Sequence, residues 1–158
     1  MFHDKQLNIK IGKIGEDLAC EYLKSNGYKI IDRNFRRPYG EIDIIATKSG
    51  NLTFFEVKAL KMWQNNSASN VGAIAEDTLV PEDNLTASKL KKLRKICEMF
   101  AVKHSDLFND NNGWQIDLLA IVISEESKGR PPIPSSGEYQ SLTIKGKGCL
   151  IKHYENIG

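Results

Sequence analysis

Two apolar segments joined by one short turn constrain the fold of this chain more than any other feature. Residues 41–47 and 52–58 are rich in Ile, Phe and Val, and the sequence Lys-Ser-Gly-Asn at 48–51 is typical of a tight turn. We therefore expect two adjacent antiparallel strands, since a two-residue loop is the commonest hairpin connection. Successive side chains of a strand point to opposite faces, so the position of the loop decides which residues lie across from each other.

The rest of the pattern predicts an α/β chain with a mixed sheet. Apolar residues recur at helical spacing before Asn26-Gly27, and residues 118–123 form a continuous apolar run typical of a central strand. The elements we expect, in chain order, are a helix over 11–25, strands over 28–34, 41–47 and 52–58, a helix from Thr86 or Ser88 to about His104, a strand over 114–124, and a hairpin of strands over 140–145 and 150–154.

Length and composition indicate one globular domain over residues 1–158. Two polar segments, about 61–85 and 125–138, interrupt it, and a loop as long as the first is usually functional or mobile. The three cysteines lie far apart without a Cys-x-x-Cys pair, which argues against disulfides and a zinc site. Without a secretion signal in residues 1–10 or an apolar run near the roughly 20 residues that cross a bilayer, we expect a cytoplasmic protein with no membrane partner.

The hairpin carries the residues with the most chemical potential. Glu56 and Lys58 are two residues apart on one strand and therefore share a face. If residues 49–50 form the loop, Asp43 lies directly across from Glu56; if residues 50–51 form it, Asp43 faces Lys58 and lies diagonal to Glu56. Both arrangements put all three side chains on one face of the hairpin, with opposed Cβ atoms about 5 Å apart.

Two carboxylates at this separation repel each other unless a positive charge lies between them. Magnesium typically takes one or two carboxylates and keeps several waters, and the backbone carbonyl of Val57 offers a further oxygen. Lys58 beside such an ion would hold or deprotonate a water, or stabilise charge on a phosphate, which indicates hydrolysis of a phosphodiester. The alternative is purely structural, a salt bridge from Lys58 to Glu56 or Glu41.

The wider pattern resembles the YraN-type family of small bacterial proteins, which belongs to the PD-(D/E)xK nuclease superfamily. The matching segments occur in order along nearly the whole chain: Gly15-Glu16-Asp17-Leu18-Ala19, Gly27 to Arg36, Gly40-Glu41-Ile42-Asp43-Ile44-Ile45-Ala46, Phe54-Phe55-Glu56-Val57-Lys58, Ile116 to Val122, and His153-Tyr154-Glu155-Asn156.

The resemblance implies a restriction-endonuclease-like αβββαβ core, with a central mixed sheet flanked by helices. It implies that Asp43, Glu56 and Lys58 take the catalytic positions, and that Glu16 matches an acid of the first helix that often joins the metal site. With the Val57 carbonyl suggested above, the expected metal ligands are Asp43, Glu56, Glu16 and Val57. The chain departs from many relatives after Lys58, where Ala59-Leu60 replaces Thr-Arg, and before Asp117, where an arginine is often found. These differences affect the expected substrate contacts more than the site chemistry.

Basic residues supply the candidates for nucleic-acid binding, although the net charge is only +2. Arg33, Arg36 and Arg37 precede the strand that carries Asp43, and Lys89 begins a basic helix face that runs to Lys95. We interpret Asp117 as structural. The histidines His3, His104 and His153 share no ligand spacing, and we interpret them as bystanders.

Together these features predict a Mg²⁺- or Mn²⁺-dependent endonuclease that acts on nucleic acid, with DNA favoured over RNA. Branched or damaged DNA enters only by analogy with junction resolvases of the superfamily. The alternative function is a nuclease-like module that binds nucleic acid without cutting it, and the third is a scaffold with salt-bridged acids. The sequence leaves homodimer formation open.

Overall fold

A computed structural model describes residues 2–61, 85–109, 113–124 and 139–158. The long segments expected at about 61–85 and 125–138 therefore lie, apart from end residues, outside the described residues. The elements are α1 (Phe2–Ser25), β1 (Lys29–Arg37), β2 (Gly40–Lys48), β3 (Asn51–Lys61), α3 (Ala87–Lys103), a 3₁₀ turn (Ser105–Leu107), β4 (Trp114–Ile123), β5 (Gln140–Ile144) and β6 (Lys147–Tyr154).

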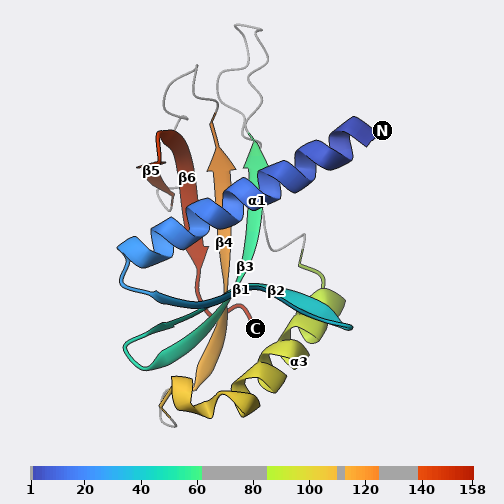
Figure 1. Ribbon diagram of the computed structural model, residues 1–158, viewed down its shortest axis with the longest axis vertical. Helices are drawn as coiled ribbons and strands as arrows, with labels where there is room; N and C mark the ends of the chain where they lie inside the picture. The colour runs from blue at the N-terminus through green and yellow to red at the C-terminus, as the bar shows by residue number, and fades with distance from the viewer. Residues whose placement is uncertain (1, 62–84, 110–112, 125–138) are drawn as a thin grey trace, which may run out of the picture.

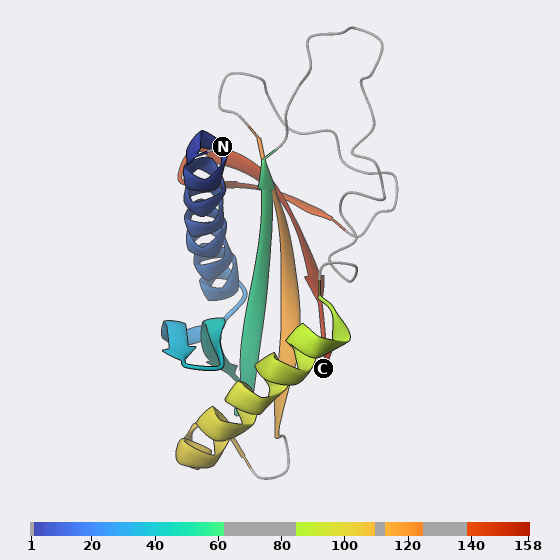
Figure 2. The ribbon, with the colours of Figure 1, turned by 90° about the vertical axis from the view of Figure 1, so that its right-hand side faces the viewer.

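The strands form one sheet in the order β1-β2-β3-β4-β6-β5. Its strand pairs are antiparallel except for β3 and β4, which are parallel and are connected through α3. Figure 2 shows α1 along one side of the sheet and α3 crossing the lower part of β3 and β4, and the two helices pack in separate apolar clusters. The predicted α/β class, with a mixed sheet flanked by helices, is confirmed and is consistent with a restriction-endonuclease-like fold.

The two helices cover separate apolar layers. Leu23 of α1 packs in one cluster with Phe55, whereas Phe100 of α3 packs in the other with Phe54. The neighbours Phe54 and Phe55 divide between the layers because alternate side chains of β3 point to opposite faces. Residues 116–123 of β4 are buried throughout, as expected for the central strand.

The helices differ in how well their starts were predicted. Thr86 caps α3, with its side chain accepting a hydrogen bond from the Lys89 N–H at 3.3 Å, as one alternative predicted. In contrast, α1 begins at Phe2 rather than residue 11, and Figure 1 shows its N-terminal part extending beyond the sheet. Ile9 there is 66% exposed, so this part lacks the buried stripe on which the prediction relied. No helix in the described ranges is long and apolar enough to cross a membrane.

The β2–β3 turn follows the first of the two predicted arrangements. Lys48 pairs with Asn51, so Ser49 and Gly50 form the loop. Their φ angles of 51° and 78° are both left-handed, as the favoured two-residue hairpin turn requires. This register directs Asp43 towards Glu56.

β2 bends away from β3 just before Asp43 is paired. The described pairing of the two strands ends at Ile44 and Phe55. Ile42 packs in the α3 cluster and Ile44 in the α1 cluster, although residues two apart on a regular strand share a face. Figure 1 shows this part of β2 running with β1 across the direction of β3. Asp43 therefore lies at the point where the two strands separate.

α1 approaches β3 closely at Gly15. A Cβ atom at this position would lie 2.3 Å from the Cβ of Ala59, whereas one at Gly12 would meet nothing within 4 Å. The close contact brings the segment that contains Glu16 against the strand that carries Glu56 and Lys58.

We predict opposite effects for two alanine substitutions one turn apart on α1. Gly15→Ala forces the helix off β3 and lowers the free energy of unfolding by about 1–3 kcal/mol. Gly12→Ala raises it by up to about 1 kcal/mol, since alanine favours a helix over glycine. Urea unfolding of both variants checks this. Equal effects of the same sign would contradict the proposed close contact.

Candidate active site

Where β2 separates from β3, the Asp43 side chain takes the place of a backbone carbonyl as hydrogen-bond acceptor for β3. The Val57 N–H donates a hydrogen bond of 2.7 Å to Oδ2 of Asp43. This N–H lies just beyond the last described β2–β3 pair, where the neighbouring backbone is no longer in register. A buried N–H without an acceptor is costly, so the carboxylate completes the pairing of β3.

The surroundings of Asp43 disfavour its negative charge. Asp43 is only 9% exposed. Burial, and then the charge of Glu56, raises the pKa of Asp43 to about 7, with a smaller contribution from Glu16 in the same direction. The Val57 N–H and the Lys58 ammonium act against this rise but do not cancel it. The site thus holds a carboxyl group that a nearby cation would stabilise as carboxylate.

Glu56 and Lys58 form the salt bridge that was the structural alternative at this site. Lys58 Nζ lies 2.5 Å from Oε1 of Glu56, and the two side chains are 36% and 16% exposed. The pair confirms that these residues share a face of β3. Glu41 takes no part in it, because its Oε2 accepts from Nε of Arg36 at 2.9 Å.

Glu16 reaches this region from α1 instead of facing solvent alone. Its Oε2 accepts a hydrogen bond of 3.0 Å from the side-chain amide of Asn34 and lies 3.8 Å from Nη2 of Arg33. Asn34 has a φ of 52°, a left-handed conformation that asparagine tolerates better than most residues. Sequence reasoning did not identify this asparagine, because its role depends on a contact between β1 and α1.

The donor atoms present are those of a hard divalent cation. Asp43, Glu56 and Glu16 supply carboxylate oxygens, the ligand type that Mg²⁺ prefers. A strand residue directs its N–H and C=O to the same neighbour, so the Val57 carbonyl faces the side on which Asp43 lies. Within the described ranges no three Asp, Glu, His or Cys side chains are already gathered at metal-binding distance. Each carboxylate is instead held by a protein donor: the Val57 N–H, Lys58 and Asn34.

The predicted phosphate-binding arginines are engaged to different degrees. Arg33 Nη2 lies 2.8 Å from Oδ1 of Asp17, and Arg36 is paired with Glu41, so acids already neutralise both. The Arg37 guanidinium lies 4.1 Å from the centre of the Phe35 ring, and its Nη1 donates to the Arg36 carbonyl. Lys89, in the first turn of α3, is exposed. Arg37 and Lys89 are thus better placed than Arg33 to meet a phosphate.

His153 has a structural partner that the sequence did not reveal. Its Nε2 lies 2.7 Å from Oδ2 of Asp117, a fully buried acid on β4. Oδ1 of Asp117 also accepts from Nε2 of Gln115 at 2.8 Å and from the Asn156 N–H at 2.9 Å. An acid in a buried strand requires such partners. The structural interpretation of Asp117 is therefore supported, and the network joins the last residues to β4.

Comparison with known proteins identifies the relatives of this chain. Residues 15–121 match the model of a family described as "Uncharacterised protein family UPF0102", the family of YraN-type proteins. The chain belongs to this family. The resemblance inferred from the sequence is thereby confirmed, and the matched span includes Glu16, Asp43, Glu56 and Lys58.

UPF0102 proteins from several bacteria align with most of this chain. One from Fervidobacterium nodosum is 30% identical over 96% of this chain and 84% of its own length. One from Persephonella marina is 34% identical over 70% of this chain and 82% of its own, and one from Campylobacter lari 36% over 68% and 79%. The family name states no reaction.

We predict that Asp43 makes folding stability depend on pH. Because the folded-state pKa is raised to about 7, ionisation is easier in the unfolded chain, and native stability is lost as pH rises from about 4 through 7. In a chelating buffer, Asp43→Asn, which keeps an acceptor for the Val57 N–H, escapes this loss. The free energy of unfolding of Asp43→Asn, relative to that of the native chain, should rise by about 4 kcal/mol between pH 4 and pH 8. Urea unfolding at both pH values measures this, and a difference independent of pH would refute it.

Proposed function

We propose that this UPF0102 protein is a Mg²⁺- or Mn²⁺-dependent endonuclease that hydrolyses phosphodiester bonds of nucleic acid. The observation that carries the proposal is the buried Asp43 carboxyl beside Glu56, with its pKa raised first by burial and then by the Glu56 charge. A fold does not need to bury an acid beside another acid, whereas a metal-dependent site does, and strongly perturbed carboxyl groups are concentrated at functional sites. Lys58 lies two residues after Glu56, on the same face of β3, and forms a salt bridge with it.

The residues of the site divide the work between binding and proton transfer. Asp43, Glu56 and Glu16, with the carbonyl of Val57, would hold the divalent ion. The ion, when bound, supplies Lewis acidity and lowers the pKa of a coordinated water. Lys58, whose side chain is 36% exposed, would orient the attacking water or stabilise charge on the scissile phosphate. Its ammonium already lies against Glu56, which fixes the end of this side chain at the site.

Nucleic acid is the proposed substrate, with DNA ahead of RNA. Arg37 and Lys89 offer exposed cations to the backbone phosphates, while Arg33 and Arg36 are partly neutralised by acids. A protein with a net charge of +2 relies on such local cations, because its total charge attracts phosphate weakly. The choice of branched or damaged DNA as the substrate rests only on analogy with the superfamily.

A silent nucleic-acid-binding module is the competing function, and one observation favours it. Lys58 neutralises Glu56 directly, and the described residues contain no ready-made group of three metal ligands. A protein that only binds nucleic acid would keep the same fold and the same exposed cations. Metal binding separates the two functions, since only the endonuclease requires it.

We predict that the metal and the chemistry depend on different residues of the site. Asp43→Asn and Glu56→Gln should each weaken Mn²⁺ binding by at least about tenfold in calorimetry, since each removes a proposed ligand. Lys58→Met should keep Mn²⁺ binding and reduce cleavage of labelled DNA by about 100-fold or more. Glu41→Gln is the matched control, because Glu41 is an acid on the same strand as Asp43 that pairs with Arg36.

Cleavage is measured on single-stranded, duplex and four-way-junction DNA in parallel. Mn²⁺ binding that is unchanged in Asp43→Asn and Glu56→Gln would contradict the ligand assignment. A native chain that binds no Mn²⁺ would overturn the endonuclease and leave the binding module.

A further inference from the structure

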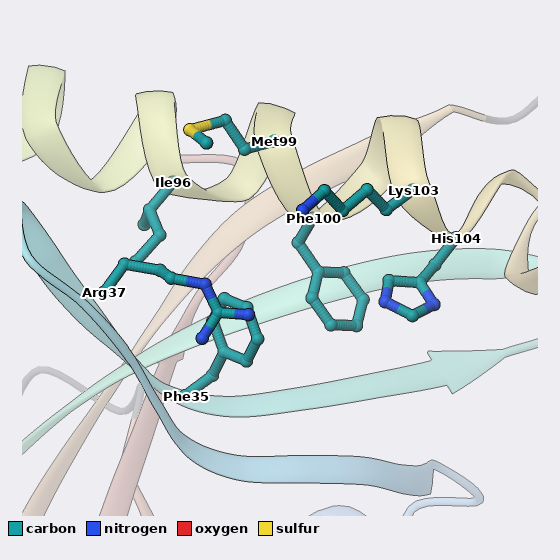
Figure 3. A pocket seen from close by; sticks show the side chains of 7 residues that line it. All are labelled: Phe35, Arg37, Ile96, Met99, Phe100, Lys103 and His104. Atoms are coloured by element: carbon teal, nitrogen blue, oxygen red, sulfur yellow. The ribbon is translucent and has the colours of Figure 1, made fainter.

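A hollow between β1 and α3 combines ring surfaces with positive charge. Figure 3 shows the rings of Phe35, Phe100 and His104 lying together beneath α3, with Arg37 and Lys103 beside them. Ile96 and Met99 complete its lining. We call it the α3 hollow. None of the predicted catalytic residues lines it.

The three rings of the α3 hollow contact one another, and the exposed ring of His104, stacked on the buried Phe100, is the platform that a flat ligand can reach. Phe35 meets Phe100 edge to face, with ring centres 5.1 Å apart at 86°. His104 stacks on Phe100, with ring centres 4.2 Å apart at 28°. His104 is the C-cap of α3, and its backbone N–H bonds to the carbonyls of Phe100 and Ala101 at 3.1 and 3.2 Å. His104 is exposed, yet its ring is held in place by its contact with Phe100. Little side-chain entropy therefore remains to be lost when a ligand binds.

The charges at the hollow are positive. The Arg37 guanidinium lies 4.1 Å above the Phe35 ring, and Lys103 is exposed in the last turn of α3. No carboxylate is among the lining residues. Two acids near these residues in sequence, Glu41 and Glu98, form ion pairs with Arg36 and Arg94. Asp106, two residues after His104, lies in the 3₁₀ turn and is not a lining residue. The surface therefore suits a ligand with a flat ring and a negative charge.

We propose that the α3 hollow binds one unpaired nucleotide of a nucleic-acid strand. Its base stacks on His104, and its phosphate meets Arg37 and Lys103. Cationic grooves with exposed aromatic rings bind single strands in this way, since every base has a stacking face. An acidic peptide would satisfy the cations but leave the platform without a ring of matching shape.

The α3 hollow adjoins the candidate active site through the β1–β2 hairpin. Phe35 pairs with Ile42, the residue before Asp43. Arg37 pairs with Gly40, which is about 10 Å along the strand from Asp43. A strand held in the hollow thus places a phosphate only a few nucleotides away at Asp43, given about 3.4 Å per stacked nucleotide. This inference rests on the proposed function and deepens it, because it names DNA with unpaired nucleotides near the cut as the substrate class.

The test measures DNA binding by fluorescence anisotropy in EDTA, which removes divalent ions and so prevents cleavage. The probes are one labelled single-stranded oligonucleotide and the duplex of the same sequence. His104→Ala and Arg37→Ala should each weaken single-strand binding by about tenfold. His104→Ala should change duplex binding by less than about twofold, because paired bases stay within the stack. His104→Phe should retain single-strand binding, since it keeps a ring on Phe100.

Lys29→Ala is the matched control, as Lys29 is an exposed lysine on β1, the strand of Phe35 and Arg37, that does not line the hollow. Thermal unfolding verifies that each variant is folded. A deoxynucleoside monophosphate serves as competitor, and displacement at concentrations as low as those of the strand would mark the hollow as a free-nucleotide site and overturn the proposal. Equal single-strand binding by the native chain and His104→Ala, or no such binding by the native chain, would overturn it as well.

DNA cleavage with Mn²⁺ is assayed on the same proteins, so the two proposals can fail separately. Loss of single-strand binding in His104→Ala without any cleavage by the native chain would support the hollow and overturn the endonuclease. Cleavage by the native chain, together with single-strand binding that is unchanged in His104→Ala, would support the endonuclease and overturn the hollow.

Discussion

The hydrogen bond from the Val57 N–H to Asp43 is the interaction on which the candidate site depends. β2 accompanies β3 as far as the Ile44–Phe55 pair and then turns away with β1. The next N–H on this edge of β3 requires an acceptor, and the carboxylate of Asp43 supplies it at 2.7 Å. One side chain thus allows the two strands to separate without leaving this N–H unpaired, and it places the Asp43 carboxyl at the point of separation, where the charge of Glu56 acts on it.

The same arrangement places opposing demands on Asp43. As a hydrogen-bond acceptor it is most effective when ionised, yet burial and Glu56 favour its protonated form. Asparagine would accept the same hydrogen bond without this conflict. An acid at this position is therefore explained by chemistry more readily than by folding, and Lys58 provides the compensating charge through Glu56.

The sequence predicted most of this fold because its patterns are local. The alternation in β2 and β3, the turn at Ser49-Gly50 and the cap at Thr86 each depend on neighbours in the chain. They were sufficient to place Glu56 and Lys58 on one face of β3. The extra turns of α1 before residue 11 were missed, because an overhanging helix has no buried stripe to produce a periodic pattern.

Features that join distant segments were not predictable in the same way. The bend at Asp43 depends on β1 drawing β2 away from β3, and alternation alone describes a straight hairpin. His153 gained its role from a buried acid on another strand. His104 became part of a ring platform only when α3 packed on β1. In each case the deciding contact lies between elements that no spacing rule connects.

The parallel pairing of β3 with β4 has a consequence for how such proteins diverge. Parallel neighbours require a crossover, and here it spans residues 62–113, entirely outside the hairpin that carries Asp43, Glu56 and Lys58. Closing a longer flexible loop costs little, about 0.6 kcal/mol for each doubling of its length. Insertions and deletions between β3 and β4 can therefore accumulate while the hairpin keeps its register, and lineages of this family can vary this connection without rebuilding the site.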